Sequence, residues 1–430
     1  MIDVRLTATN PEDSTLVPVP CNARGELLTV APKIESIPND VVINGDLTVT
    51  GLINGQDLSS KIELPPGAFD GAYLGWQDGQ LVWFGTPLPP VLEGSFRPVI
   101  YTGNGGAQSI TGVGFSPDLV WIKSREDASH ALCNSISGFN KRLKSNNTDA
   151  EYIYNPPVIA SANDGFDLLT SDPDHNANTV PYVAWCWDAG NTTVTNNDGT
   201  IESQVRSNGD FSVVKYVGTG SPATIGIGLN SAPKMIITKN ITSNASWAVY
   251  HSALGNGKLL ELEKSGSARD SGSAWNSTDP TSSSFSVGNY PDTNNNSESY
   301  IGYCWAEMPG ISSFGEFSGN GSRNTVVTGF RPSFVIIKSI RLGNWYMFDN
   351  ARGTSQALYS NLAEKESNTG AVEFLEDGFQ LLFGLPGANE SGETYIYAAF
   401  ANPEDAAFAQ RQLRSQARQE ERQQNETLLR

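Results

Sequence analysis

Short apolar runs separated by turn-forming residues recur along the chain. The run "PYVAWCW", residues 181–187, is apolar at both its odd and its even positions, so a strand here would bury both of its faces. Runs of the same character, "SYIGYCW" at 299–305 and "TYIYAAF" at 394–400, follow later in the chain. The pattern predicts a central, doubly covered strand that the chain contains three times.

The same motifs precede each of these strands in the same order. Each copy opens with an aromatic residue, a G-x-G turn and an apolar run that ends in lysine, at Lys123, Lys239 and Lys338. From that lysine to the tyrosine of the later strand the separations are 59, 61 and 57 residues. We therefore predict three tandem repeat domains, called repeats 1, 2 and 3 below. They are expected at residues 96–190, 191–308 and 309–402.

The fold class follows from the period and the composition. A period near 100 residues exceeds that of solenoids and propellers, so each repeat is expected to have its own core, and the three to form beads in a row. The sequence contains 42 Gly and 24 Pro but only 4 Met, which favours short strands joined by turns. We expect an all-β protein with β-sandwich-like repeats.

The N-terminal flank differs from the repeats. In residues 1–60, the stretch "NDVVINGDLTVTGLINGQDLSS" predicts a β ribbon with too little apolar surface to stand alone, so we expect a homotrimeric attachment stem. Residues 61–95 contain "GAYLGWQDGQLVWFG", a predicted β-hairpin with an Asp-Gly turn, and then a Pro-rich linker.

The C-terminal flank, residues 403–430, predicts a short α-helix. Asn402 is suited to cap it and Pro403 to occupy its first turn. Four arginines recur at steps of three and four, which is typical either of a solvated helix face or of a docking site for an acidic partner. They are Arg411, Arg414, Arg418 and Arg422.

Charge narrows the classes of partner. With 28 basic and 46 acidic residues the formal charge is −18, which opposes binding to nucleic acid. We expect no membrane insertion, because the sequence has no apolar run of spanning length, and no signal peptide at the N-terminus. Four scattered cysteines predict buried free thiols rather than a disulfide framework. They are Cys21, Cys133, Cys186 and Cys304.

The stem motif "NGDLTVTGLING", the hairpin "YLGWQDGQLVW" and repeats of the form "GFSPDLVWIKSR…DGFDLLT…YVAWCW" together resemble tail-fibre and related appendage proteins of tailed bacteriophages, those of marine cyanobacteria in particular. The resemblance implies a homotrimeric structural protein of the virion tail, assembled in the host cytoplasm, that mediates host attachment. It also implies other tail or adaptor proteins as partners and a host surface glycan or protein as receptor. The alternatives are an architectural head or tail decoration protein and, less expected, a polysaccharide-degrading tailspike.

Candidate chemistry is sparse, and we expect neither an enzyme nor a cofactor. No histidine recurs in all three repeats, and one aligned position holds Asn134, His251 and Asp349, which suggests a solvent-facing site. The loop "DTNNNSE" at 292–298 begins like a calcium loop, but Ser297 replaces the glycine of such a loop, so a plain polar loop is the alternative.

Two sets of residues are candidates for ligand binding. Trp247, Trp345 and Tyr346 would stack on sugar rings if they are exposed at a rim, or would be core residues if they are not. The recurring lysines introduced above are the only charged residues present in every repeat. They would share a ligand contact, or extend over a neighbouring aromatic ring.

Overall fold

The computed structural model describes residues 95–155 and 159–406, the helical residues 408, 409 and 413, and the backbone of six short strands before residue 95. The chain divides into two compact units, Met1–Val91 and Leu92–Arg430. The larger unit contains all three repeats, and in the described residues its structure is almost entirely β.

The six strands of the smaller unit form three antiparallel pairs. The pair β5–β6 confirms the predicted hairpin, with Tyr73 opposite Phe84. Most of the predicted stem, and with it the basis of the predicted trimer, lies outside the described residues. The six strands are β1 (Thr7–Thr9), β2 (Leu16–Pro18), β3 (Leu52–Ile53), β4 (Gln56–Asp57), β5 (Tyr73–Gln77) and β6 (Gln80–Phe84).

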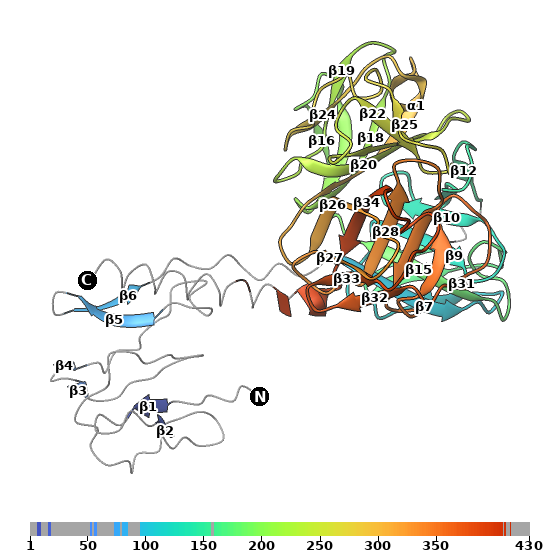
Figure 1. Ribbon diagram of the computed structural model, residues 1–430. Coiled ribbons are helices and arrows are strands. Elements are labelled where there is room, and N and C mark those ends of the chain that lie inside the picture. The colour runs from blue at the N-terminus through green and yellow to red at the C-terminus, as the bar shows by residue number, and fades with distance from the viewer. Residues whose placement is uncertain are drawn as a thin grey trace. The chain divides into compact units, whose positions relative to one another are not determined.

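Each repeat consists of a larger antiparallel sheet and a smaller sheet packed against it (Figure 1). Repeat 1 contains β7 (Phe96–Thr102), β8 (Gln108–Ile110), β9 (Leu119–Ser124), β10 (His130–Asn134), β11 (Lys141–Arg142), β12 (Tyr152–Ile153), β13 (Ile159–Ala162), β14 (Gly165–Leu168) and β15 (Pro181–Trp187). Its larger sheet has the order β10-β9-β15-β7 and its smaller sheet the order β13-β14-β8, while β11 pairs with β12.

Repeats 2 and 3 follow the same plan with extended larger sheets, in the orders β16-β17-β18-β25-β20-β21-β22-β23 and β26-β34-β28-β29-β30-β31. Repeat 2 contains β16 (Thr193–Asn196), β17 (Ser203–Ser207), β18 (Phe211–Val217), β19 (Ala223–Gly226), β20 (Pro233–Asn240), β21 (Trp247–His251), β22 (Lys258–Glu261), β23 (Arg269–Asp270), β24 (Ser284–Val287), the single helical turn α1 (Pro291–Asn294) and β25 (Ser299–Ala306). Repeat 3 contains β26 (Ser312–Ser318), β27 (Asn324–Val327), β28 (Phe334–Ser339), β29 (Trp345–Asp349), β30 (Gln356–Tyr359), β31 (Ser367–Asn368), β32 (Val372–Leu375), β33 (Gly378–Leu381) and β34 (Thr394–Phe400). The smaller sheets are β19-β24 and β27-β33-β32.

Strand β15, the run that is apolar at both parities, contributes to two cores. Its residue Cys186 lies in the core between the two sheets of repeat 1. On the opposite face, Trp185 and Trp187 lie in a second core to which all three repeats contribute. Strands β25 and β34 divide their residues in the same way. Each repeat therefore has its own core, as predicted, and shares a further one.

The shared core is aromatic and joins the repeats directly. The ring centroid of Trp187 lies 5.9 Å from that of Trp305 in repeat 2 and 5.6 Å from that of Phe400 in repeat 3. A small apolar cavity of about 10 Å³, the size of one water-sized sphere, remains between these rings. The expectation of beads in a row is therefore wrong, because the second apolar face of each central strand is covered by the other repeats.

Three equivalent seams close the repeats into a ring. At each seam the loop after the repeat lysine exchanges two backbone hydrogen bonds with a loop of the preceding repeat, repeat 3 preceding repeat 1. The bonds are Ala128 N to Ala363 O and Glu366 N to Arg125 O, Ala245 N to Thr148 O and Glu151 N to Ile241 O, and Gly343 N to Ser265 O and Ala268 N to Ile340 O. Such head-to-tail contacts, repeated three times and closing on themselves, give the unit a threefold pseudosymmetry.

Ion pairs reinforce the seam between repeats 3 and 1, which no covalent linker spans. Arg125 of repeat 1 lies 2.6 Å from Glu366 of repeat 3, and Glu366 also lies 3.4 Å from Arg352. Arg97, at the start of repeat 1, pairs with Glu404 just beyond repeat 3. These ion pairs add to the hydrogen bonds and the shared core that join the two ends of the ring.

The predicted C-terminal helix is present, and it begins beside this seam. The side chain of Asn402 accepts a 2.8 Å hydrogen bond from the backbone N–H of Asp405, which is the expected N-cap. Ala406 and Ala409 are buried in the core of repeat 3. Among the described residues, no helix has the length and apolar character needed to span a membrane.

Candidate functional site

The three repeat lysines are buried at the seams. Lys123, Lys239 and Lys338 are each 0% exposed, and burial lowers the pKa of each to about 8. Their amino groups donate to backbone carbonyls of the seam loops. The acceptors are Ser124 O at 2.6 Å and Glu126 O at 2.9 Å, Asn240 O at 2.7 Å and Thr148 O at 3.3 Å, and Ser339 O at 2.6 Å and Arg341 O at 2.9 Å. The lysines therefore fix the shape of the loops and present no charge to a surface ligand.

The candidate aromatic residues are also enclosed. Trp247 and Trp345 are 0% and 1% exposed, and Tyr346 is 8% exposed. Each indole N–H donates to a carbonyl of the preceding repeat, Trp247 to Lys144 O and Trp345 to Glu261 O, both at 3.0 Å. Of the two alternatives, the structure shows core residues. Trp247 and Trp345 lie in the core that the repeats share, and Tyr346 lies in the core of repeat 3 itself.

The aligned position 134/251/349 is buried as well, at 2%, 1% and 0% exposure, so its predicted solvent exposure is wrong. Each of its side chains binds the central strand of the following repeat. Asn134 donates to the Tyr303 hydroxyl at 3.2 Å, His251 Nε2–H donates to Tyr397 O at 3.0 Å, and Asp349 accepts from Trp185 Nε1–H at 3.0 Å. Burial lowers the pKa of His251 to about 4.

One recurring residue was missed in the sequence. Asn176, Asn294 and Asn389 are each 0% exposed, and each stands six residues before the tyrosine of the central strand in a shared P-x-x-N pattern. In repeat 2, Asn294 accepts from Thr219 N at 2.7 Å and donates to Ser221 O at 2.6 Å, across the G-x-G turn. The equal spacing in all three copies was the signal that could have identified it.

The remaining predicted sites are the cysteines, the helix arginines and the possible calcium loop. Three of the cysteines are buried free thiols, while Cys21 and the four arginines of the terminal helix lie outside the described residues. In the loop 292–298, Asp292 accepts from Ser246 N at 3.1 Å. In the described part of the chain, no group of three or more His, Cys, Asp or Glu side chains could hold a metal ion.

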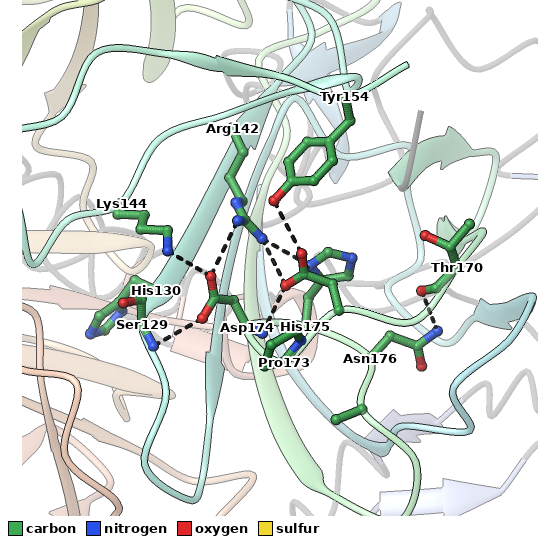
Figure 2. A network of polar contacts seen from close by, with 12 residues as sticks. Ser129, His130, Arg142, Lys144, Tyr154, Thr170, Pro173, Asp174, His175 and Asn176 are labelled. Carbon is green, nitrogen blue, oxygen red and sulfur yellow. Dashed lines mark hydrogen bonds and ion pairs between the residues drawn. The ribbon is translucent and has the colours of Figure 1, made fainter. Parts of the chain in front are cut away.

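Repeat 1 contains a network of charged side chains around the buried Arg142 (Figure 2). Arg142 lies 2.9 Å from a carboxylate oxygen of Asp172 and 3.2 Å from one of Asp174. Tyr154 donates from its hydroxyl to Asp172 at 3.1 Å, and its ring lies under the Arg142 guanidinium at 4.7 Å. His175 Nδ1 lies 3.3 Å from Asp172. Figure 2 shows the side chains of Arg142 and Lys144 both directed toward the carboxylate of Asp174.

The charges of this network satisfy one another. Burial raises the pKa of Asp172, but the hydrogen bond from His175 and the charge of Arg142 outweigh it and hold that pKa well below its usual range. A carboxylate fixed in the ionised form can accept hydrogen bonds but cannot act as a general acid. The arrangement is suited to the rigid support of Tyr154, whose ring lies against Arg142.

The other repeats have apolar residues where repeat 1 has Arg142. By strand pairing the equivalent positions are Leu259 and Ala357, which lie in the cores of repeats 2 and 3. Exchanging apolar packing for buried charge seldom adds stability. Such an exchange in one of three equivalent repeats marks this place as a specialised one.

Comparisons with known proteins complete the description of the site. Residues 94–403 match the family model described as "Domain of unknown function (DUF7483)". The search of curated proteins found no match. Among solved structures, a chain from "Life in the extremes: atomic structure of Sulfolobus Turreted Icosahedral Virus" has a TM-score of 0.10 and 10% identity over 77% of this chain and 88% of that chain, a likeness too low to carry an argument.

Proposed function

The chain belongs to the DUF7483 family, whose description specifies no activity, and we propose that it is a structural virion protein, a homotrimeric phage tail fibre that mediates attachment to the host cell surface. The observation that carries the proposal is the use of the recurring polar side chains. The lysines, the position 134/251/349 and the asparagines of the P-x-x-N pattern all bind the protein's own backbone or its neighbouring repeats. Polar side chains used in this way support a role as a rigid structural body.

The proposal also assigns a part in the fibre to each region of the chain. In the described part of residues 92–430, both apolar faces of each central strand are covered within the chain, so the proposal requires no contact between the heads of three chains. In this proposal the trimer contacts therefore belong to residues 1–91, with the stem toward the particle and the ring toward the host.

A polysaccharide-degrading tailspike is the less supported candidate. Glycoside hydrolysis uses two carboxyl groups on opposite sides of the bond to be cleaved, one of them protonated. In the network of repeat 1, Asp172 and Asp174 instead share Arg142. An architectural decoration protein without receptor binding stays the main alternative to a fibre.

The solution mass of the full chain tests the proposal. We expect a mass three times 46.2 kDa for the full chain and a monomer for a chain lacking residues 1–91. Multi-angle light scattering on both chains measures this directly. Monomers in both samples would refute the fibre and favour a decoration protein that assembles only on its particle.

A further inference from the structure

The three seams contain the same hydrogen bond with different donors. The residue opposite the repeat lysine is Trp247 in repeat 2 and Trp345 in repeat 3, and each indole N–H donates to a carbonyl of the preceding repeat. The equivalent residue of repeat 1 is His130, which lies opposite Lys123. Its Nε2 lies 2.8 Å from Tyr359 O of repeat 3. At one seam, a titratable imidazole therefore takes the place of an indole.

Both ring nitrogens of His130 are engaged while the imidazole is neutral. The indole N–H of Trp121 donates to Nδ1 at 2.8 Å, so the ring proton is on Nε2, which donates to Tyr359 O. Trp121 also belongs to repeat 1 alone, because the equivalent residues are Ile237 and Ile336. A second proton on Nδ1 would face the Trp121 N–H, and two donors cannot bond to each other. Protonation therefore breaks a contact of the closed seam.

The surroundings of the ring disfavour this second proton. His130 is 0% exposed, and burial, with a smaller effect from the charge of Lys123, lowers its pKa to about 3. Nearby carboxylates are engaged elsewhere, since Asp174 pairs with basic side chains of repeat 1 and Glu366 with Arg125. The charged side chains on the elements around the ring are Lys123, Arg125, Asp127, Asp174, Arg352 and Glu366.

The seam that His130 occupies is the one without a covalent linker. Residues 188–210 connect β15 to β18, and residues 307–311 connect β25 to β26, so repeat 2 stays tethered to both of its neighbours. Repeats 3 and 1 are joined to each other by non-covalent contacts. A ring that opens here separates two repeats without straining a linker, and each repeat keeps its own core.

Opening of this seam is linked to proton uptake. In an open ring the imidazole regains the ordinary histidine pKa of 6.5, whereas in the closed ring its pKa is about 3. The open form therefore binds more protons between these values, and the closed form loses relative stability as the pH falls. From pH 7.5 to pH 5.0, the ratio of open to closed molecules should rise about thirtyfold. Ordinary carboxyl groups take up protons mainly below this range.

We propose that His130 is a pH sensor for ring closure. The neutral imidazole holds the seam between repeats 3 and 1 closed, and the protonated imidazole opens this seam while the two tethered seams persist. Opening uncovers part of the aromatic core that the repeats share. The inference concerns the ring within a single chain, so it does not depend on the fibre proposal.

Hydrogen exchange of the full-length protein, followed by mass spectrometry, tests the sensor. The amides of Ala128 and Glu366 bond across this seam, and those of Ala245 and Glu151 bond across the seam between repeats 1 and 2. The exchange rates are corrected for the intrinsic effect of pH. From pH 7.5 to 5.0, we expect the protection of the first pair to fall about thirtyfold and that of the second pair by less than about threefold.

Two variants remove the titration and keep a donor at the seam. His130→Gln retains one donor and one acceptor, and Trp121→Ile with His130→Trp gives repeat 1 the residues of the other repeats. In both, protection at Ala128 and Glu366 should change less than about threefold between the two pH values. His251→Asn removes the buried histidine of another seam and is the matched control, which should keep the wild-type response.

Two results would overturn the inference. One is a wild-type protein in which protection falls equally at the two seams, or falls at neither, because the closing seam would then have no sensitivity of its own. The other is a response at the closing seam that persists in both variants, since groups other than His130 would then be responsible for it.

Discussion

At the position shared by Asn134, His251 and Asp349, three different side chains have the same structural role. Each binds the central strand of the following repeat, where the facing position presents a tyrosine hydroxyl, a bare alanine and a tryptophan N–H in turn. Where alanine offers no polar group, histidine reaches the adjacent backbone carbonyl. The three side chains differ because each complements a different partner across its seam. The prediction took this difference as a sign of solvent exposure, which is why it was wrong.

The substitution His251→Asn, which introduces the residue of repeat 1, should change the pH dependence of stability. The unfolded histidine gains a proton near pH 6.5, but the folded one only near pH 4, so the wild type loses stability as pH falls through this window. Relative to the variant, the loss should reach about 2–3 kcal/mol by pH 4.5. Urea unfolding at pH 7.5 and 4.5 measures it; parallel changes in the two proteins would contradict the assignment.

Among the elements, the G-x-G turn of each repeat depends on the asparagine beneath it. In repeat 2, a Cβ at Gly218 would lie 2.3 Å from Asn295 O, and Gly220 has φ +69°, so both glycines are required. Asn294 then ties the turn to the loop before β25. The G-x-G turn and the P-x-x-N pattern are each present in the sequence, but the two lie about 75 residues apart, so sequence pattern could not show that they contact one another.

Replacing Asn294 with aspartate should destabilise the protein by about 3 kcal/mol or more. The change keeps the shape but places an oxygen where the amide donates to Ser221 O and Gly288 O, each at 2.6 Å. Thermal and urea unfolding measure the effect. Asn295→Asp, the same change at the exposed next residue, is the control and should shift stability by less than about 0.5 kcal/mol; equal effects would argue against the tie.

For the whole molecule, the sequence predicted the repeats but not the ring. The apolar residues at both parities of "PYVAWCW" correctly indicated a strand with both faces covered, and local signals identified the β5–β6 hairpin and the Asn402 cap. Periodicity shows that a face is buried and not what covers it. The burial of Trp247 and Lys123 depended on that missing partner, so neither could be placed from the sequence.

Because the three repeats share a core, we expect them to unfold together. Trp187→Ala should cost about 3–5 kcal/mol and lower one transition that includes all three repeats, because its ring contacts residues of repeats 2 and 3. Differential scanning calorimetry of the wild type and the variant tests this. As a control, Leu168→Ala removes a side chain from the core of repeat 1 alone and should lower the same single transition. Separate transitions, of which only one shifts in a variant, would instead indicate repeats that unfold independently.

The seam between repeats 3 and 1 also has a consequence for folding during synthesis, because its two sides are made at different times. Trp185 finds its acceptor on Asp349, 164 residues later in the chain. At ~5–20 residues per second, the ribosome needs roughly ten to thirty seconds to add that stretch. During this interval the first repeat has emerged with one aromatic face uncovered. Transiently exposed apolar surface promotes aggregation, so the nascent chain is most exposed to this risk before the last repeat is made and closes the ring.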